Sequence, residues 1–366
     1  MKNKVKINNI STSPKVLVAP LEWGLGHATR CIPIINGLLD KNCEVFIAAE
    51  GATHSLLKQE FPAVTFLPLI GYRIKYSRNK YFLPLKILAQ FPKLILTIYK
   101  EHQWLKKIVK KYKIDAIISD NRFGMYHSKI LSIYITHQLL IKTGNAFYEK
   151  IARLIHFYFI NKYDECWIPD FEVNGLAGEL SHPKILPKKI KYIGGLSRFE
   201  LNITEKKYDL LISISGPEPQ RKFFEEQILK ELKSYFGKVL FIRGLPGCSE
   251  ELKSANSLVV IKNHLSAKEI NEAILQSDMI ISRCGYTTVM DLIKLQKKAI
   301  LVPTPGQTEQ EYLAKHLREK KICYTINQKD FVLQNSLKGV QTFAFATLDY
   351  NMEQYKNVIA EFVQLL

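Results

Sequence analysis

The stretch that decides the fold is residues 278–314, DMIISRCGYTTVMDLIKLQKKAILVPTPGQTEQEYLA. The apolar run at residues 278–282 is typical of a strand buried on both faces of a parallel sheet. A polar turn at residues 284–288 separates this run from a helical pattern. The apolar positions of that helix are Val289, Leu292, Ile293 and Leu295. Residues 298–302 predict a second buried strand, and a second helix begins at about Glu309. This order predicts a β-α-β-α unit with two helix N-termini at one edge of a sheet.

The two predicted turns carry polar residues of the kind that bind phosphates and sugars. Helix N-termini have unpaired N–H groups and a positive dipole end, so they favour anions such as a diphosphate. We expect Gly285 to adopt backbone angles that other residues avoid, and Thr287 or Thr288 to cap the helix. Asp291 lies near the loop, and the cluster at residues 306–310 adds further hydrogen-bonding groups. Ordinary doubly wound packing also gives apolar strands and capped helices, so these polar residues carry the functional hypothesis.

Length and composition indicate a globular protein of two domains. A chain of 366 residues is long for one hydrophobic core, and a hydrophobic fraction of 47% argues against disorder. The six cysteines are scattered without a Cys-x-x-Cys pair, which predicts reduced thiols in a cytoplasmic protein. The N-terminus lacks the apolar segment of a secretory signal, and no apolar run is long enough to span a bilayer, so we expect a soluble protein.

The net charge of +18 admits nucleic acid, an anionic membrane or a phosphorylated substrate as partner. A nucleic-acid-binding domain usually shows a reading helix, or interleaved aromatic and basic positions on a sheet, and this sequence shows neither. General lysine abundance accounts for part of the charge. We therefore expect no nucleic-acid partner.

A glycine-containing loop follows the first predicted strand, residues 15–20. The loop reads Gly24-x-Gly26-His27 and leads into a predicted helix over residues 28–40. A strand–loop–helix–strand order brings such a loop close to a ligand, although the third glycine of the dinucleotide fingerprint is missing. His27 is a candidate general base at the start of this helix. The alternative is a structural histidine that caps the helix.

A carboxylate follows the strand predicted at residues 115–119. Asp120 lies just past the carboxyl end of this strand, at the edge where parallel sheets bind ligands. There it can hold His27 in the correct tautomer and raise its basicity; the alternative is that it caps the next helix. The strand predicted at residues 131–135 delivers His137 to the same edge, where it is a candidate for acceptor contact.

The segment at residues 73–113 is strongly basic and rich in aromatic and aliphatic residues. Its lysines and arginines are opposed by Glu101 alone. Pro84 and Pro92 divide it, and we expect the long helix to begin after Pro92. The composition suits a surface that lies on an anionic bilayer. The alternative is a core helix with a solvated lysine face.

The second half of the chain repeats the strand–turn–helix plan. A strand predicted at residues 208–214 leads into Ser215 and Gly216, and the helix that follows carries Arg221. Loop amides, a helix N-terminus and a guanidinium in this order are candidates for binding a diphosphate. The glycine-containing stretch at residues 192–198 predicts an interdomain hinge.

The second half resembles the nucleotide-sugar site of glycosyltransferase family 28, the group that contains the lipid-linked N-acetylglucosaminyltransferase of peptidoglycan synthesis. The family pattern is an aspartate, an apolar strand, Arg/Ser-x-Gly, a threonine, an acidic residue on the helix, Val-Pro and a Gln-containing cluster. The matching positions are Asp278, Arg283, Gly285, Thr288, Asp291, Val302-Pro303 and Glu309-Gln310. Relatives often contact the nucleotide base at the position of Asn263-His264. The Ser215-Gly216 loop departs from the family, because Pro217 and Pro219 stand where relatives have more glycine.

The resemblance implies the GT-B fold, an α/β architecture of two Rossmann-like domains whose parallel sheets face each other across a cleft. GT-B enzymes carry a glycine-rich first loop with a histidine at the position of His27. Residues 1–195 would form the acceptor-binding domain, and residues 196–366 the nucleotide-sugar-binding domain. The last helix would pack back on the first domain.

The implied activity is metal-independent transfer of a sugar from a nucleotide diphosphate sugar, by default uridine-linked, to an acceptor hydroxyl. His27, with Asp120 behind it, would take the hydroxyl proton. The expected donor-binding residues are Ser215, Gly216, Arg221, Arg283, Gly285, Tyr286, Thr287, Thr288, Asp291, Gln307, Glu309 and Gln310. The expected residues of the acceptor-side loop are Gly24, Gly26, Arg30 and His137. The chain has no Asp-x-Asp triplet, so we expect no metal and no cofactor besides the sugar nucleotide. A lipid- or envelope-linked acceptor would place the protein peripherally at the inner face of the membrane.

Three alternatives stay open at this point. Gly24-x-Gly26-His27-x-x-Arg30-Cys31 also resembles the loop of nucleotide-sugar hydrolases of the pseudaminic acid pathway, in which His27 would activate water. Nucleotide-sugar 2-epimerases share the scaffold, but the first domain lacks clustered carboxylates. A non-enzymatic membrane-surface subunit would leave the polar loop residues unexplained.

Overall fold

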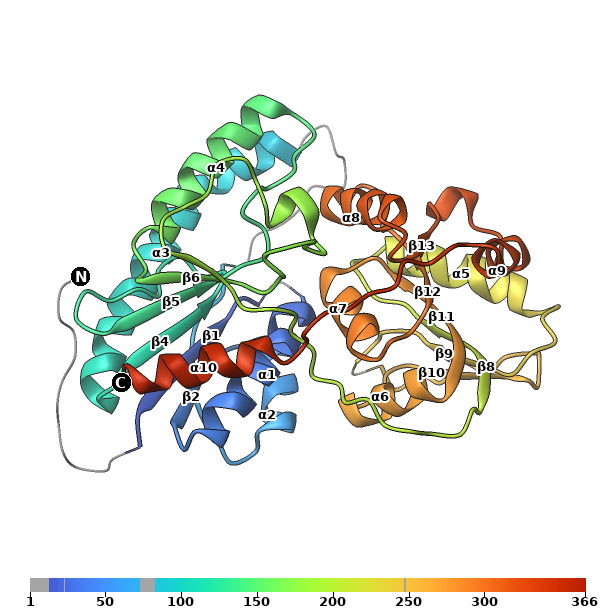
Figure 1. Cartoon of the computed structure of the whole chain (residues 1–366), viewed down its shortest axis with the longest axis horizontal. Helices are drawn as coiled ribbons and strands as arrows, with labels where there is room; N and C mark the ends of the chain where they lie inside the picture. The colour runs from blue at the N-terminus through green and yellow to red at the C-terminus, as the bar shows by residue number, and fades with distance from the viewer. Residues whose placement is uncertain (1–12, 23, 73–82, 247) are drawn as a thin grey trace. The chain divides into compact units, whose positions relative to one another are not determined.

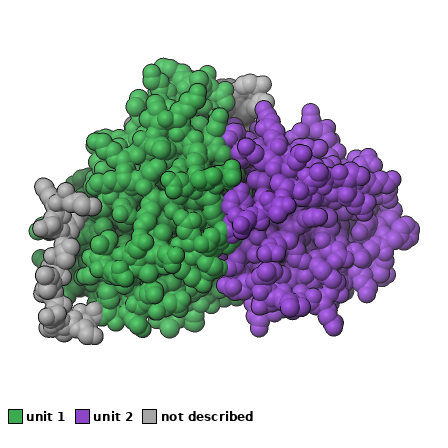
Figure 2. All heavy atoms as spheres, in the orientation of Figure 1, with its two compact units in different colours: residues 1–196, 351–366 green, residues 197–350 purple. Residues whose placement is uncertain are grey.

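The computed structural model describes residues 13–22, 24–72, 83–246 and 248–366. The chain forms two compact units (Figure 2). Unit 1 contains Met1–Leu196 and Asn351–Leu366, and unit 2 contains Ser197–Tyr350. The boundary expected from the sequence lay between residues 195 and 196. Residues 73–82 of the basic segment lie outside the described residues.

In its described residues, unit 1 contains a parallel sheet of seven strands in the order β3-β2-β1-β4-β5-β6-β7 (Figure 1). The strands are β1 (Lys15–Pro20), β2 (Glu44–Ala49), β3 (Thr65–Pro68), β4 (Ala116–Asp120), β5 (Leu131–Ile135), β6 (Glu165–Ile168) and β7 (Ile190–Tyr192). The helices are α1 (Leu25–Asp40), α2 (Gly51–Glu60), α3 (Leu83–Tyr112), α4 (Ala146–Ile160) and α10 (Gln354–Gln364), with a 3₁₀ turn η2 at Gly178–Leu180.

Side-chain alternation along the central strands divides the core of unit 1 between the two faces of the sheet. Val16 and Val18 of β1 pack with residues of α1, α2 and α10. Leu17 and Ala19 point to the opposite face and pack with residues of α3. The last helix, α10, therefore completes the layer that α1 begins, although all of unit 2 separates the two helices in the sequence.

In its described residues, unit 2 contains a parallel sheet of six strands in the order β10-β9-β8-β11-β12-β13. The strands are β8 (Tyr208–Ser213), β9 (Val239–Ile242), β10 (Val259–Lys262), β11 (Ser277–Arg283), β12 (Ala299–Val302) and β13 (Tyr324–Thr325). The helices are α5 (Gln220–Leu232), α6 (Ala267–Leu275), α7 (Tyr286–Lys294), α8 (Thr308–Glu319) and α9 (Leu333–Gln341), with a 3₁₀ turn η3 at Gln328–Asp330. Leu210 and Ile212 of β8 pack with residues of α5 and α9.

The two parallel-sheet α/β units confirm the predicted fold class, and two local predictions were wrong. Helix α3 runs through Pro92 and does not begin after it. A proline inside a helix removes one backbone hydrogen bond and weakens the helix without always ending it. Gly285 has φ of −85°, which any residue can adopt, and it is the N-cap of α7 in place of Thr287 or Thr288.

Candidate active site

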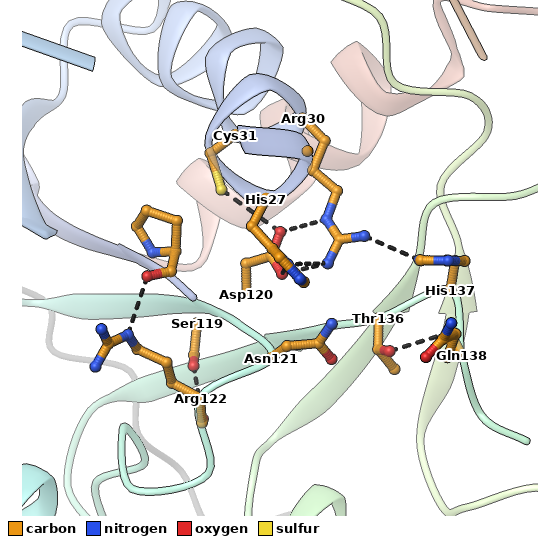
Figure 3. Close-up of polar contacts among 12 residues, drawn as sticks. His27, Arg30, Cys31, Ser119, Asp120, Asn121, Arg122, Thr136, His137 and Gln138 are labelled. Carbon is orange, nitrogen blue, oxygen red and sulfur yellow. Dashed lines mark hydrogen bonds and ion pairs between the residues drawn. The ribbon is translucent and has the colours of Figure 1, made fainter. Parts of the chain in front are cut away.

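The candidate site of unit 1 lies where the strand order of its sheet reverses. β1 and β4 are neighbours, but β2 and β3 continue on one side and β5 to β7 on the other. Loops that leave such a pair diverge, and the space beyond the carboxyl ends of the strands is the usual ligand site of a parallel sheet. The register pairs Pro20, the last residue of β1, with Asp120, the last residue of β4. His27 and Asp120, which belong to separate motifs, therefore lie at the same point of the fold (Figure 3).

Asp120 is the centre of a buried hydrogen-bond cluster (Figure 3). Its carboxylate accepts hydrogen bonds from Nε and Nη2 of Arg30. Oδ1 lies 2.8 Å from His27 Nδ1, and the Cys31 thiol lies 3.7 Å from Oδ2. Burial alone would raise the pKa of Asp120, but Arg30 and His27 outweigh burial and hold this pKa well below its usual range. Asp120 is therefore ionised at neutral pH.

His27 combines a neutral imidazole with a partly exposed edge. It lies in the first turn of α1, and its side chain is 15% exposed. Burial and the charge of Arg30 lower the pKa of His27, against the raising effect of Asp120. The imidazole is therefore neutral near pH 7, as a general base must be. Because Gly24 is the N-cap of α1, the alternative that His27 caps this helix is wrong.

Two contacts compete for Nδ1 of His27. Asp120 Oδ1 lies 2.8 Å from this nitrogen and Arg30 Nη2 lies 2.7 Å from it. An ionised carboxylate only accepts hydrogen bonds and a guanidinium only donates them, so Nδ1 can satisfy one of the two at a time. When Nδ1 carries the proton and donates it to Asp120, Nε2 keeps a lone pair for a substrate proton.

Arg30 was expected to contact the acceptor, and the structure gives it an internal role. Its side chain is only 5% exposed, and Nε and Nη2 both donate to Asp120. Nη1 lies 2.9 Å from Nδ1 of His137, which brings this predicted residue into the cluster. Since Arg30 donates, Nδ1 of His137 accepts. Arg30 thus orients Asp120 and His137 from within the protein.

Gly24 turns the chain into α1. Its φ of 77° lies in the left-handed region, which residues with a side chain rarely adopt, and its N–H donates to Glu22 O at 3.0 Å. Gly26 is the second residue of α1, and its carbonyl accepts a hydrogen bond from the Thr29 hydroxyl. The two glycines therefore shape the approach to His27.

Unit 2 shows the same reversal of strand order, between β8 and β11. Ser215 and Gly216 follow β8, Gly285 follows β11, and helices α5 and α7 begin beyond these loops. A Cβ placed on Gly216 would lie 3.7 Å from Thr304 Oγ1, so the loop after β12 reaches the same place. Thr304 is 1% exposed, and its hydroxyl has no hydrogen-bond partner among the described residues. A buried hydroxyl without a partner is costly, and a phosphate oxygen could supply the partner.

The first turn of α7 contains three of the predicted donor contacts. Tyr286, its first residue, is buried, whereas Thr287 and Thr288 are partly exposed. The two threonines therefore remain the accessible candidates of this group.

The two arginines expected at the diphosphate are both internal, which corrects their assignment. Arg221 is 5% exposed and forms an ion pair with Glu225. Arg283 is 1% exposed, and it donates from Nη1 to Gln328 Oε1 at 2.9 Å and from Nη2 to Gln220 O at 3.0 Å. Burial lowers the pKa of Arg283 to about 10. These guanidiniums fix the loops of unit 2, which leaves the loop amides and helix N-termini as the candidate phosphate ligands.

Asp291, which was expected to bind ribose hydroxyls, lies on α7. Its Oδ1 accepts a hydrogen bond from the Ser197 hydroxyl at 2.6 Å. Burial raises the pKa of Asp291 to about 7, against the lowering effects of Ser197 and Arg198. Ribose hydroxyls that donate to Asp291 would favour its ionised form.

The cluster before α8 partly stabilises its own turn. Gln310 Oε1 accepts a hydrogen bond from the Thr304 N–H at 2.9 Å, and Gln310 Nε2 donates to Gln307 Oε1. Glu309 is a first-turn residue of α8 and is half-buried. Gln307 or Gln310 could therefore contact a sugar only through hydrogen bonds beyond those that they already make within the turn.

A cavity of about 240 Å³ lies next to the loop that follows β10. Its lining includes Leu245, Leu252, Ile261, Asn263 and His264. The apolar side chains, the amide and the imidazole could contact a flat heterocyclic ring, while Glu251 and Lys262 add charged groups to the same lining. The place agrees with the position at which the family resemblance puts the nucleotide base.

Known proteins match both halves of the chain. Residues 224–364 match the glycosyltransferase family 28 C-terminal domain, and residues 16–139 match the glycosyl transferase family 1. The UDP-N-acetylglucosamine--N-acetylmuramyl-(pentapeptide) pyrophosphoryl-undecaprenol N-acetylglucosamine transferase of Rickettsia bellii is 23% identical over 266 residues, 68% of this chain and 70% of that protein. The enzyme of the same name from Amoebophilus asiaticus is 21% identical over 294 residues, 77% of this chain and 78% of that protein.

Solved structures of glycosyltransferases share the fold. The glycotransferase of kitacinnamycin has a TM-score of 0.65 at 12% identity and covers 96% of this chain and 94% of its own. Acinetobacter baumannii MurG has a TM-score of 0.51 at 14% identity, and the match covers 96% of this chain and 95% of that chain. The chain has the GT-B fold of these glycosyltransferases.

The matches to glycosyltransferase family models confirm the predicted class of enzyme, a glycosyltransferase. The comparisons give no support to the hydrolase, epimerase or non-enzymatic alternatives. None of the helices in the described part of the glycosyltransferase is both long and apolar enough to cross a bilayer.

The sequence reasoning missed a group of buried charges beside the site of the glycosyltransferase. Arg122 follows Asp120 by two residues, is fully buried, and forms ion pairs with Glu101 and Glu22. One signal was available, because Glu101 is the single acidic residue of a long basic segment. A single acidic residue in an otherwise lysine-rich helix is a candidate for an ion pair inside the protein.

Proposed function

We propose that this glycosyltransferase moves a sugar from a uridine diphosphate sugar to a hydroxyl of a lipid-linked acceptor, with His27 as general base. The observation that carries the proposal is the cluster of His27, Asp120 and Arg30 at the strand-order reversal of unit 1. It offers a neutral imidazole backed by an ionised carboxylate, which is the arrangement that proton abstraction from a hydroxyl requires.

In the proposed reaction, Nε2 of His27 accepts the proton of the acceptor hydroxyl while the hydroxyl oxygen attacks the anomeric carbon. The bond between the anomeric carbon and the diphosphate oxygen breaks, and the nucleoside diphosphate leaves. The proton stays on His27 until solvent removes it, and Asp120 stabilises the imidazolium in the meantime. Assistance of this kind contributes about 10²–10⁴-fold to a rate.

We place the diphosphate of the donor at the strand-order reversal of unit 2. The N-termini of α5 and α7 and the amides near Gly216 would stabilise the leaving group. The partnerless hydroxyl of Thr304, beneath Gly216, supports this placement. Asp291 would bind the ribose, Glu309 the sugar, and the cavity beside His264 the base. In this scheme the sugar nucleotide is a substrate, and the reaction uses no metal and no further cofactor.

The lipid-linked acceptor is supported by the names of the relatives and by an exposed apolar surface of unit 1. Helices α3 and α4 lie alongside each other and pack through Ile98 and Phe159 (Figure 1). One face of α4 exposes large apolar residues at helical spacing: Phe147 (67%), Ile151 (40%), Leu154 (60%) and Tyr158 (61%). Helix α3 adds Ile95 (41%), Leu96 (52%) and Tyr99 (60%). Contiguous exposed apolar residues of this kind mark interaction surfaces.

Helix α3 also carries exposed basic residues. The exposed lysines in the described part of α3 are Lys93, Lys100, Lys106, Lys107, Lys110 and Lys111. An apolar strip with lysines beside it suits an anionic bilayer, because the apolar groups enter the boundary of the acyl chains while the ammonium groups meet the phosphates. We therefore propose a peripheral position of the enzyme at the cytoplasmic face of the membrane.

Flotation with vesicles of anionic phospholipid tests this surface. Leu154→Glu should reduce the fraction of protein that floats, because it puts a carboxylate into the apolar strip. Phe236→Glu is the matched control, since Phe236 is an equally apolar and 90% exposed residue of unit 2. Equal flotation of both variants and the wild type would overturn the membrane-surface proposal.

Release of the nucleoside diphosphate tests the reaction itself. A panel of UDP-sugars should give little UDP with the enzyme alone and much more after addition of a bacterial lipid extract. Rapid release without any acceptor would instead indicate a hydrolase. Failure of calorimetry to detect binding of UDP or another nucleoside diphosphate would exclude the donor assignment.

A further inference from the structure

Arg122 connects three segments of unit 1 that surround the candidate site. Its side chain is fully buried, and Nε donates to Pro20 O at 2.9 Å. Nη1 lies 2.5 Å from Glu101 Oε1 on α3, and Nη2 lies 3.1 Å from Glu22 Oε2. Pro20 ends β1 and Glu22 belongs to the loop that leads to α1. One guanidinium therefore joins the end of β1, the loop before His27 and helix α3.

Glu101 fixes the guanidinium of Arg122 from the side of α3. Its carboxylate is 2% exposed, and Oε2 accepts hydrogen bonds from the Tyr72 hydroxyl at 2.8 Å and the Gly124 N–H at 3.2 Å. A Cβ on Gly124 would lie 2.5 Å from Ile98 O and 2.6 Å from Glu101 Cβ, so the chain after β4 lies directly against α3. Every oxygen of Glu101 thus has an internal partner, as a buried carboxylate requires.

The loop before α1 is fixed at both ends by the same short stretch of chain. Asp120 accepts the Leu21 N–H at its carbonyl, at 3.0 Å, and binds His27 through its carboxylate. Arg122 binds Pro20 and Glu22. Between these contacts the chain turns at Gly24 with a positive φ, which any movement of the loop would alter.

We propose that Arg122, fixed by Glu101, is a positioning residue that sets the distance between the His27 loop and Asp120. This inference rests on the proposed role of His27, but the positioning itself can be measured without turnover. It also means that the helix which presents the proposed membrane surface is linked through Glu101 and Arg122 to the loop that precedes the base.

The test compares Arg122→Lys with the wild-type protein. Lysine keeps the charge but cannot reach Pro20 O, Glu22 and Glu101 together, because its ammonium is a single point. Amide hydrogen exchange, read by mass spectrometry, should become faster in peptides covering Leu21, Glu22 and the first turn of α1. The transferase assay should show a fall in kcat of about 10–100-fold, the size expected from a small displacement of a catalytic group. The KM for the sugar nucleotide and the UDP affinity of unit 2 should not change.

Two further variants and one control separate the positioning role from a general loss of stability. Glu22→Ala removes the contact of Arg122 at the edge of the cluster, where Glu22 is 14% exposed, and leaves the buried pair of Arg122 and Glu101 in place. Glu22→Ala should also show faster exchange before α1 and a lower kcat, but both effects should be smaller than in Arg122→Lys. Glu101→Gln places an NH₂ group against either Arg122 or the Tyr72 and Gly124 donors, so it should also speed exchange before α1 and lower kcat. Asp170→Asn is the control, because Asp170 is an equally buried carboxylate of unit 1 that binds Leu176 N–H and Ala177 N–H.

The outcomes separate this inference from the proposed function. Asp170→Asn should lower the melting temperature without faster exchange before α1 and without loss of kcat in the folded protein. Exchange and kcat at wild-type values in Arg122→Lys and Glu22→Ala would overturn the positioning role. Faster exchange with unchanged kcat would overturn its link to catalysis. A wild-type enzyme without turnover would count against the proposed function alone, since the exchange result still decides whether Arg122 positions the loop.

Discussion

His27 Nδ1 lies 2.8 Å from Asp120 Oδ1, although 93 positions separate the two residues in the sequence. The contact follows from the topology, because the loop after β1 and the end of β4 meet where the strand order reverses. Arg30 occupies the remaining side of the same carboxylate. A histidine that shares its carboxylate with an arginine is neutral near pH 7 and has a fixed orientation. These are the two properties that the proposed base needs.

The pH dependence of the rate should show an acidic limb below the ordinary histidine pKa of about 6.5. Burial and Arg30 lower the pKa of His27. Protonation at Nε2 removes the base, so kcat/KM should fall only when the pH drops through this lowered value. UDP release measured over a pH series tests this, with the residual activity of His27→Gln as the control that lacks the limb. A limb centred above neutral pH would contradict the assignment.

Asp120→Asn should lower kcat by about 10²–10⁴-fold. The amide removes the negative charge that stabilises the imidazolium, and its NH₂ group can bind Nδ1 and favour the unproductive tautomer. Calorimetry should show unchanged UDP affinity, since the donor is placed on unit 2. Asp170→Asn, which also neutralises a buried carboxylate of unit 1, should leave kcat nearly unchanged. Equal losses in both variants would indicate a general loss of structure.

Asp291→Asn should stabilise unit 2 above pH 7 and weaken UDP binding. Burial raises the pKa of Asp291 to about 7, so the folded state favours the protonated form, and its contribution to stability is lost as the pH rises through 7. Asparagine stays neutral and avoids this loss. Each kcal/mol of stability that it retains should raise the melting temperature by about 2–4 °C. Thermal melts at pH 6 and pH 8 give the stability, and calorimetry gives the affinity. Unchanged UDP affinity would remove Asp291 from the ribose site.

Arg221→Gln distinguishes an internal arginine from a phosphate ligand. Its guanidinium is buried against Glu225, so the substitution should lower the free energy of unfolding by about 1–3 kcal/mol. UDP affinity, measured at a temperature where the variant is folded, should stay within about twofold of the wild type. A drop of tenfold or more, about 1.4 kcal/mol, would restore Arg221 to the diphosphate site.

The sequence was sufficient for most strands and for the residues that follow them, but β7 (Ile190–Tyr192) lies in a stretch that was read as irregular and as a linker. Buried parallel strands are short apolar runs, and polar residues directly after them must lie at one edge, so His27, Asp120 and His137 could be named before the fold was known. Helix α2 was not predicted, because only Thr53 and Leu57 of its residues are buried and its apolar pattern is weak. Helix α9 was not predicted either, although its buried residues Leu333 and Val340 stand at helical spacing.

The errors at the site concern charged side chains. Arg221 and Arg283 were expected to add positive charge at the diphosphate, and Arg30 was expected in the acceptor-side loop. Each is instead buried and bonded to partners distant in the sequence or on its own helix, such as Asp120, Glu225 and Gln328. Sequence spacing does not show which way such a side chain points. The contacts of Arg122 with Glu101 and Glu22 were invisible for the same reason, since they span 21 and 100 positions.

One measurement tests the central claim most directly: UDP release from a UDP-sugar and a lipid-linked acceptor, by the wild-type enzyme and by His27→Ala, with UDP binding to both measured by calorimetry. The account predicts that His27→Ala binds UDP as tightly as the wild type but releases it at a rate about 10²–10⁴-fold lower. Turnover of His27→Ala at the wild-type rate, with UDP binding intact, would show that the cluster around Asp120 is not the catalytic base.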